Sequence, residues 1–157
     1  MSFYYDRFES PVGPLYLLMK YDQLARVSIL LAPSGFRQGK AARALTDEFR
    51  KYFEGALDAF TYPLAPLDGT AFERGIWLAL REIPYGQTRS YKWLAARAGH
   101  PGAARAAGRA LAKNPLPIVL PCHRVIESDG SLGGYSPELA IKRRLLEAEY
   151  YHSIHSR

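Results

Sequence analysis

Alternating apolar and polar positions predict β-strands at the start of the chain. Residues 3–9, 15–20 and 24–31 carry such runs, and turn-forming residues stand between them at 11–14 and 22–23. Three short strands in succession are typical of an antiparallel meander. The beginning of the chain is therefore expected to form a small antiparallel sheet.

After Gly39 the apolar period changes to 3.6 residues, which predicts a helix that ends at Gly55. Its apolar face is formed by Ala41, Leu45, Phe49 and Phe53. An extended segment over 60–64 leads into a stretch at 65–69 that carries proline and glycine. We place a domain boundary there, with an N-terminal domain over 1–66 and a C-terminal domain over 67–157.

The C-terminal domain is predicted to be mainly helical. Thr70 and Glu73 have the spacing of a capping box, and an apolar stripe follows at Phe72, Ile76, Trp77 and Leu80. Two shorter helices over 90–98 and 102–113 are separated by Gly99-His100-Pro101, the layout of a helix-turn-helix. We expect short extended pieces at 118–120 and 125–126.

A last helix is predicted to begin with Ser136 as N-cap and Pro137 at its first position, and to carry Leu145 and Glu149. His152 and His155 beyond it are read as a solvated tail and not as metal ligands. The fold class is therefore α/β.

Composition adds a charge asymmetry to this picture. The 157 residues are 48% hydrophobic, which excludes a disordered chain, and the formal net charge is +6. Residues 1–66 hold 8 basic and 7 acidic side chains, whereas 67–157 hold 13 and 8. The basic residues around the helix-turn-helix, opposed there by Glu82, are Arg74, Arg81, Arg89, Lys92, Arg97, Arg105, Arg109, Lys113 and Arg124. Such a cluster favours a nucleic-acid partner, with a solvated helix face as the alternative.

The single cysteine, Cys122, excludes an internal disulfide and a cysteine-rich zinc cage. The N-terminal stretch has no apolar signal region, and no apolar run approaches the length of a membrane span. We expect a cytoplasmic protein without a membrane segment, and a monomer.

The second helix of the helix-turn-helix is built of small residues and arginines. Ala103, Ala104, Ala106 and Gly108 leave Arg105 and Arg109 as its bulky side chains. A reader of base sequence needs several long polar side chains, so this helix favours sequence-independent docking and makes the minor groove plausible. An alanine-rich helix packed against a neighbour is the alternative.

Cys122 stands between Pro121 and His123. A neighbouring histidine can favour the thiolate, which makes a thiol a nucleophile, while a buried cysteine is otherwise inert. In an extended chain the two side chains would point apart, so contact needs a turn or a bridging water. A carboxylate that orients the imidazole would strengthen the hypothesis, and the candidates are Glu127, Glu147 and Glu149.

The segment 121–126, Pro-Cys-His-Arg-Val-Ile, resembles the active-site motif of the alkylguanine-DNA alkyltransferases, the methylated-DNA–protein-cysteine methyltransferase family. Segments 83–91, 101–108, 114–115 and 133–136 fall in the family's order and spacing. The resemblance covers about residues 70–149 strongly and the first 66 in general layout. It implies a ribonuclease-like N-terminal domain and a C-terminal winged helix-turn-helix domain.

The resemblance also implies an activity: irreversible, single-turnover transfer of the alkyl group of O6-alkylguanine in DNA to Cys122, without cofactor or metal. O4-alkylthymine is a further candidate substrate. By matching positions, His123 takes the thiol proton through a water and Glu149 orients His123. Tyr91 helps to rotate the nucleotide out of the duplex and donates toward the guanine ring, because O6 cannot be reached inside the stack.

Further roles follow from the same match. Arg105 is expected to fill the space of the flipped base, within a minor-groove surface formed with Ala103, Ala104, Ala106, Gly108 and Arg109. Asn114 is expected to brace the turn before Cys122, or simply to cap the preceding helix. The pocket is completed by the carbonyls of Cys122 and Val125, by Tyr135 and by the Ser136 amide. Pro137, where relatives often carry glycine, and the bulky Arg109 depart from the family pattern.

Three other functions remain open at this point. A relative that binds the lesion without repair would share the fold but lack the thiol that Cys122 supplies. A winged-helix regulator fits the alanine-rich helix poorly. A cysteine hydrolase would leave the basic helix-turn-helix without a use.

Overall fold

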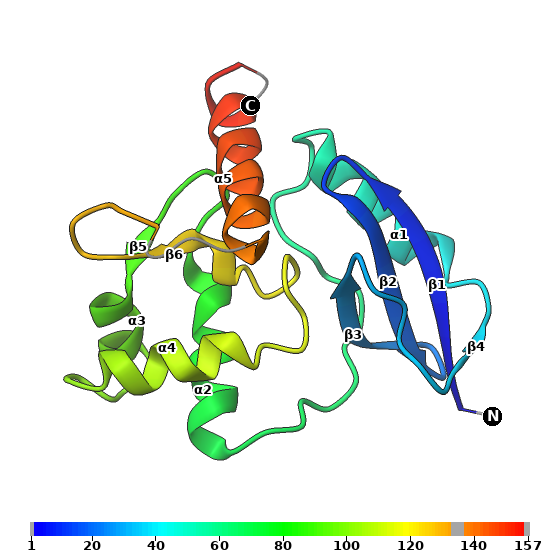
Figure 1. Ribbon diagram of the computed structural model, residues 1–157, viewed down its shortest axis with the longest axis horizontal. Helices are drawn as coiled ribbons and strands as arrows, with labels where there is room; N and C mark the ends of the chain where they lie inside the picture. The colour runs from blue at the N-terminus through cyan, green and yellow to red at the C-terminus, as the bar shows by residue number, and fades with distance from the viewer. Residues whose placement is uncertain (1, 133–136, 156–157) are drawn as a thin grey trace.

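The computed structural model describes residues 2–132 and 137–155, and its first half is an antiparallel sheet with one helix (Figure 1). Strands β1 (Phe3–Ser10), β2 (Gly13–Lys20) and β3 (Gln23–Ile29) form the predicted meander. The short β4 (Arg37–Gln38) adds a parallel edge, which gives the order β3-β2-β1-β4. Leu15, Leu17 and Met19 of the central β2 are fully buried. Helix α1 (Arg43–Phe53) packs on this sheet through Leu45 and Phe49.

The segment 60–64 was expected to be extended, and Leu64 forms an isolated parallel bridge with Leu24 of β3. The carboxylate of Glu48 on α1 holds the start of this segment, because it accepts hydrogen bonds from the backbone N–H groups of Thr61 and Tyr62. These amides are therefore not available to a sheet neighbour.

The second half contains the predicted helix-turn-helix. Helix α2 (Ala71–Ala79) begins at the Thr70–Glu73 capping box, in which both reciprocal hydrogen bonds are formed, and continues into the 3-10 turn η1 (Leu80–Glu82). Helices α3 (Tyr91–Arg97) and α4 (Ala104–Ala112) follow. Ala107 and Ala110 of α4 are buried, and the indole N–H of Trp77 donates to the Ala110 carbonyl at 2.8 Å. Small residues thus let α4 pack closely against its neighbours, as the alternative interpretation of an alanine-rich packed helix predicted.

Two short strands, β5 (Arg89–Ser90) and β6 (Val125–Ile126), pair in parallel and place the helix-turn-helix beside the segment that carries the cysteine. That segment is the 3-10 turn η2 (Cys122–Arg124), which leads directly into β6. The loop after β6 projects from the domain in the position of a wing (Figure 1).

The expectation of an extended piece at 118–120 is wrong. Ile118 has a φ of 77°, and the Leu120 N–H donates to the Leu116 carbonyl at 2.8 Å, so the chain turns there. Asn114 holds this turn, since its side chain donates to the Leu120 carbonyl and accepts from the Leu116 N–H.

Helix α5 (Pro137–His155) starts at the predicted proline and runs farther than expected. His152 is therefore not part of a solvated tail. Its ring packs so closely on Gly55 that a Cβ on this glycine would lie 2.4 Å from it. Gly55 also has a φ of 77°, so close approach and backbone conformation both require glycine there. The Ser136 N-cap lies outside the described residues.

One cluster of buried side chains extends through both halves of the chain, from Leu15 and Phe49 to Trp77, Leu94 and Leu145. The described residues contain no helix that is long and apolar enough to cross a membrane.

We expect Thr70→Ala to lower the free energy of unfolding by about 1 kcal/mol, because the Glu73 N–H loses its hydrogen-bond acceptor. Denaturant unfolding followed by circular dichroism measures this. Thr70→Ser should retain most of the stability, and Ser34→Ala, at an exposed loop serine, serves as the control. Equal stability of Thr70→Ala and the unchanged protein would contradict a contribution of the capping box.

Candidate active site

The cysteine lies at the start of a tight turn with a histidine and an arginine behind it. Cys122 is partly exposed, whereas His123 and Arg124 are buried at 4% and 7% exposure. The 3-10 turn η2 produces this arrangement, because it does not alternate side chains between two faces as an extended chain would. The chain is thus not extended at Cys122 and His123, but their side chains form no direct hydrogen bond among the described residues.

The carboxylate behind His123 is that of Glu149. Of the three candidates, Glu127 and Glu147 are exposed, while Glu149 is 2% exposed and its Oε2 lies 2.5 Å from His123 Nε2. A carboxylate can only accept, so Nε2 carries the proton of this hydrogen bond. His123 Nδ1 is buried and has no hydrogen-bond partner among the described residues. The other ring nitrogen is thus available for a proton.

Glu149 is also held by groups that the sequence did not indicate. Arg124 donates from Nε to Oε1 at 2.9 Å and from its terminal nitrogen to Oε2 at 3.1 Å. The Gly86 N–H donates to Oε1 at 3.1 Å, and the Tyr52 hydroxyl donates to Oε2 at 2.7 Å. Burial alone would raise the pKa of Glu149, but the His123 and Arg124 contacts outweigh it and lower the pKa to about 2.

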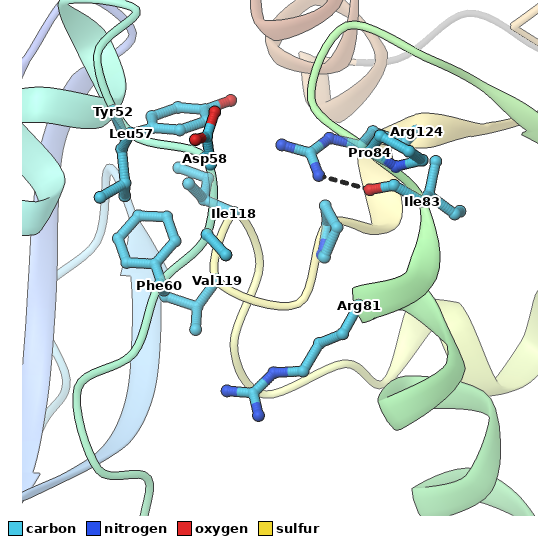
Figure 2. A pocket seen from close by; sticks show the side chains of 12 residues that line it. Tyr52, Leu57, Asp58, Phe60, Arg81, Ile83, Pro84, Ile118, Val119 and Arg124 are labelled. Carbon is cyan, nitrogen blue, oxygen red and sulfur yellow. Dashed lines mark hydrogen bonds between the residues drawn. The ribbon is translucent and has the colours of Figure 1, made fainter.

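These contacts correct the expected place of Arg124. It was counted with the basic surface, but it is buried against Glu149 and donates to the Ile83 carbonyl at 2.8 Å (Figure 2). Its charge is therefore paired with the buried Glu149 carboxylate and does not add to the basic surface. Arg97 is likewise paired, with Glu82 at 2.5 Å.

Two opposing effects act on the thiol and the imidazole. Desolvation by the surrounding protein raises the pKa of Cys122, while Asn114 and the Lys142 ammonium lower it. Burial lowers the pKa of His123, and Glu149 opposes that effect. At neutral pH the pair therefore rests as a thiol next to a neutral imidazole, which suits an acceptor for the thiol proton.

Lys142 is a further group near the cysteine that the sequence reading did not single out. Its Nζ donates to the Val125 carbonyl at 2.5 Å and lies 5.8 Å from the centre of the Tyr91 ring. Lys142 and Glu149 are seven residues apart, two turns of one helix, so both face the cysteine turn. This spacing is a signal from which the lysine could have been found.

The predicted substrate-facing residues that the structure describes lie around this turn. Tyr91 is half-buried at the start of α3 and lies near Gly108 of α4, while Val125 is fully buried. Burial raises the pKa of Tyr91, so its hydroxyl remains a donor. Asn114 is linked to the turn before Cys122 as described above. Tyr135 and Ser136 lie outside the described residues.

Helix α4 presents its arginines on the side away from the core. Arg105 and Arg109, one helical turn apart, are exposed, and Ala103, Ala104, Ala106 and Gly108 are partly exposed. The structure thus brings Cys122, His123, Val125 and Glu149 together, with Tyr91 beside them, whereas Arg105 and Arg109 stand on the neighbouring surface. Among the described residues, no three His, Cys, Asp or Glu side chains are grouped to hold a metal ion.

The fold and the site together define a class of protein: a winged helix-turn-helix domain with a cysteine backed by a buried His–Glu pair. Residues 71–151 match the family model described as 6-O-methylguanine DNA methyltransferase, DNA binding domain. The methylated-DNA–protein-cysteine methyltransferase of Methanosarcina barkeri is 44% identical over 93% of this chain and 96% of its own. That of Mycobacterium tuberculosis is 41% identical over 93% and 92%.

The architecture agrees with a solved structure. The crystal structure of Mycobacterium tuberculosis OGT in complex with DNA matches with a TM-score of 0.88 and 40% identity, over 95% of this chain and 94% of that one. The chain belongs to the methylated-DNA–protein-cysteine methyltransferase family.

The low pKa of Glu149 predicts how stability changes with pH. Because the pKa falls from 4.5 to about 2 on folding, the ionised carboxylate stabilises the protein above about pH 4.5, and this contribution is lost as the pH falls toward 2. At pH 7, Glu149→Gln should cost about 3–5 kcal/mol, since it leaves Arg124 buried without a counter-charge. The difference in the free energy of unfolding between this variant and the unchanged protein should become smaller in acid. Urea unfolding at pH 7, 5 and 3 measures it, and a constant difference would show that Glu149 is not the group that titrates.

Proposed function

We propose that this protein repairs DNA by direct transfer of the alkyl group of O6-alkylguanine to Cys122. Family membership supports alkyl transfer from DNA to a protein cysteine, and Cys122 is the single cysteine of the chain. The observation that carries the assignment is the turn η2, in which a partly exposed thiol is followed by an imidazole held by a buried carboxylate.

The transfer is a displacement at the alkyl carbon. The thiol of Cys122 loses its proton to Nδ1 of His123, through a water, and Glu149 stabilises the imidazolium that forms. The thiolate attacks the alkyl carbon, so a carbon–sulfur bond forms while the bond from this carbon to O6 breaks. The electron pair of the broken bond stays with the guanine, which takes up one proton in exchange for the proton that the thiol gave to His123, and Tyr91 donates toward its ring during this step. The thioether is stable, so each molecule acts once.

Duplex DNA is bound through α4, in the minor groove and largely without regard to sequence. Exposed Arg105 and Arg109 supply charge to the phosphates, and the alanines and Gly108 allow close approach. Arg105 takes the space of the nucleotide that is rotated out. Val125 and Asn114 shape the pocket, together with Tyr135 and Ser136. We propose that the protein acts as a monomer.

The assignment predicts a covalent product. When the protein is mixed with an equimolar duplex that contains one O6-methylguanine, the peptide with Cys122 should gain the mass of one methylene group, and the base should be restored to guanine. Intact and peptide mass spectrometry with nucleoside analysis measures both. Cys122→Ser should bind the duplex without transfer, because a hydroxyl is far less nucleophilic at neutral pH. Binding without a gain in mass by the unchanged protein would instead indicate lesion recognition without repair.

A second prediction separates base flipping from chemistry. Arg105→Ala should slow repair of duplex DNA by about tenfold or more, since the loss of one good contact to the displaced base site is worth ~1–3 kcal/mol, while reaction with free O6-benzylguanine changes little. Single-turnover rates with the two substrates give the comparison. Arg143→Ala, an exposed arginine of α5, is the matched control. Equal losses with both substrates would place Arg105 in folding or chemistry and not in flipping.

A further inference from the structure

Tyr52, near the end of α1, extends from the N-terminal half of the chain into the His123–Glu149 pair. Its hydroxyl donates to Glu149 Oε2 at 2.7 Å and lies 3.4 Å from His123 Nε2. The side chain is 3% exposed, and its ring packs against Phe60 and Tyr85, each with centroids 5.8 Å apart. The aromatic packing thus fixes the hydroxyl at the same carboxylate oxygen that binds the imidazole.

Tyr52 lies where the two halves of the chain meet, between two cavities. One, of about 150 Å³, is lined by Phe60, Arg81 and Arg124 among others (Figure 2). The other, of about 450 Å³, includes Phe53 and His152 in its wall. Phe60 and Tyr85 hold the Tyr52 ring beside these cavities, and its hydroxyl adds a directed hydrogen bond to the Glu149 carboxylate.

We propose that Tyr52 is a positioning residue for alkyl transfer: its hydroxyl holds Glu149 Oε2 against His123 Nε2 and so keeps the proton acceptor of Cys122 in its working orientation. Through this contact the N-terminal half of the chain takes part in the reaction. Tyr52 acts through Glu149 and His123, and no bond to it forms or breaks. The inference rests on the proposed function.

The electrostatic environment suits this task. Burial and the Glu149 charge raise the pKa of Tyr52 well above its usual value, so the phenol stays a donor throughout the working pH range. The titratable and charged side chains that interact with it are Glu149 of α5, His123 and Arg124 of η2, and Tyr85 of the loop before β5. Among them, Glu149 and His123 lie within 3.4 Å of the hydroxyl. The same two cavities are also lined by Asp58, Arg81, Arg144, Glu147 and His152.

Tyr52→Phe removes the hydroxyl and keeps the ring. We expect the methyl-transfer rate constant of the full-length protein, with the O6-methylguanine duplex, to fall about tenfold, which corresponds to ~1.4 kcal/mol. The loosened carboxylate stabilises the imidazolium less, so the pKa of His123 should fall, and the midpoint of the pH–rate profile, which follows the neutral imidazole, should move to lower pH with it. Duplex affinity should stay within about twofold. Single-turnover kinetics across pH and NMR titration of the His123 ring measure these effects.

Tyr62→Phe is the matched control, since it removes a hydroxyl that donates to the Asp22 carbonyl in the same half of the chain. It should change neither the rate profile nor the His123 titration. If Tyr52→Phe lowers the melting temperature but leaves the His123 titration and the pH midpoint unchanged, Tyr52 serves packing only and the inference is wrong. Because the NMR titration needs no substrate, it decides this point even if the unchanged protein fails to transfer a methyl group, a result that would overturn the proposed function.

Discussion

The structure depends most on one buried charge, the carboxylate of Glu149. An unpaired carboxylate in this position would cost several kcal/mol, so it must be compensated by donors. Tyr52 of α1, the Gly86 amide, and His123 and Arg124 of η2 supply them. These groups come from segments that are far apart along the chain. A single side chain therefore links α1, the loop before β5, the cysteine turn and α5.

The same constraint sets the geometry around Cys122. The turn η2 directs His123 and Arg124 inward to Glu149 and leaves Cys122 partly exposed. Asn114 fixes the approach to this turn through the Leu120 carbonyl. Since α4 packs through Ala107 and Ala110 on the core, its arginines stay on the surface. A packed interior thus supports both the cysteine turn and the basic helix.

Local patterns predicted much of the fold correctly. The meander, the Thr70 capping box, the helix-turn-helix and the start of α5 at Pro137 agree with the structure, and the family follows from the motifs. Segment 118–120 was misjudged because apolar content was read as extended structure, whereas Asn114 holds a turn there through side-chain hydrogen bonds. The roles of the individual site residues, the DNA contacts of α4 among them, remain predictions.

The sequence by itself determined most of the elements and the family, because helix period, capping and motif spacing act over a few neighbouring residues, and its single cysteine gives one candidate nucleophile. The residues around His123 left three carboxylates open and the family resemblance indicated Glu149, which the tertiary structure places against the imidazole. Only the tertiary structure decided that Arg124 is buried and that Tyr52 reaches this carboxylate. These outcomes depend on contacts through space: Tyr52 and Glu149 are 97 positions apart along the chain, and their hydrogen bond exists only once α1 and α5 pack together. A charge buried by packing selects its partners by proximity in the folded chain, and no local pattern records that selection.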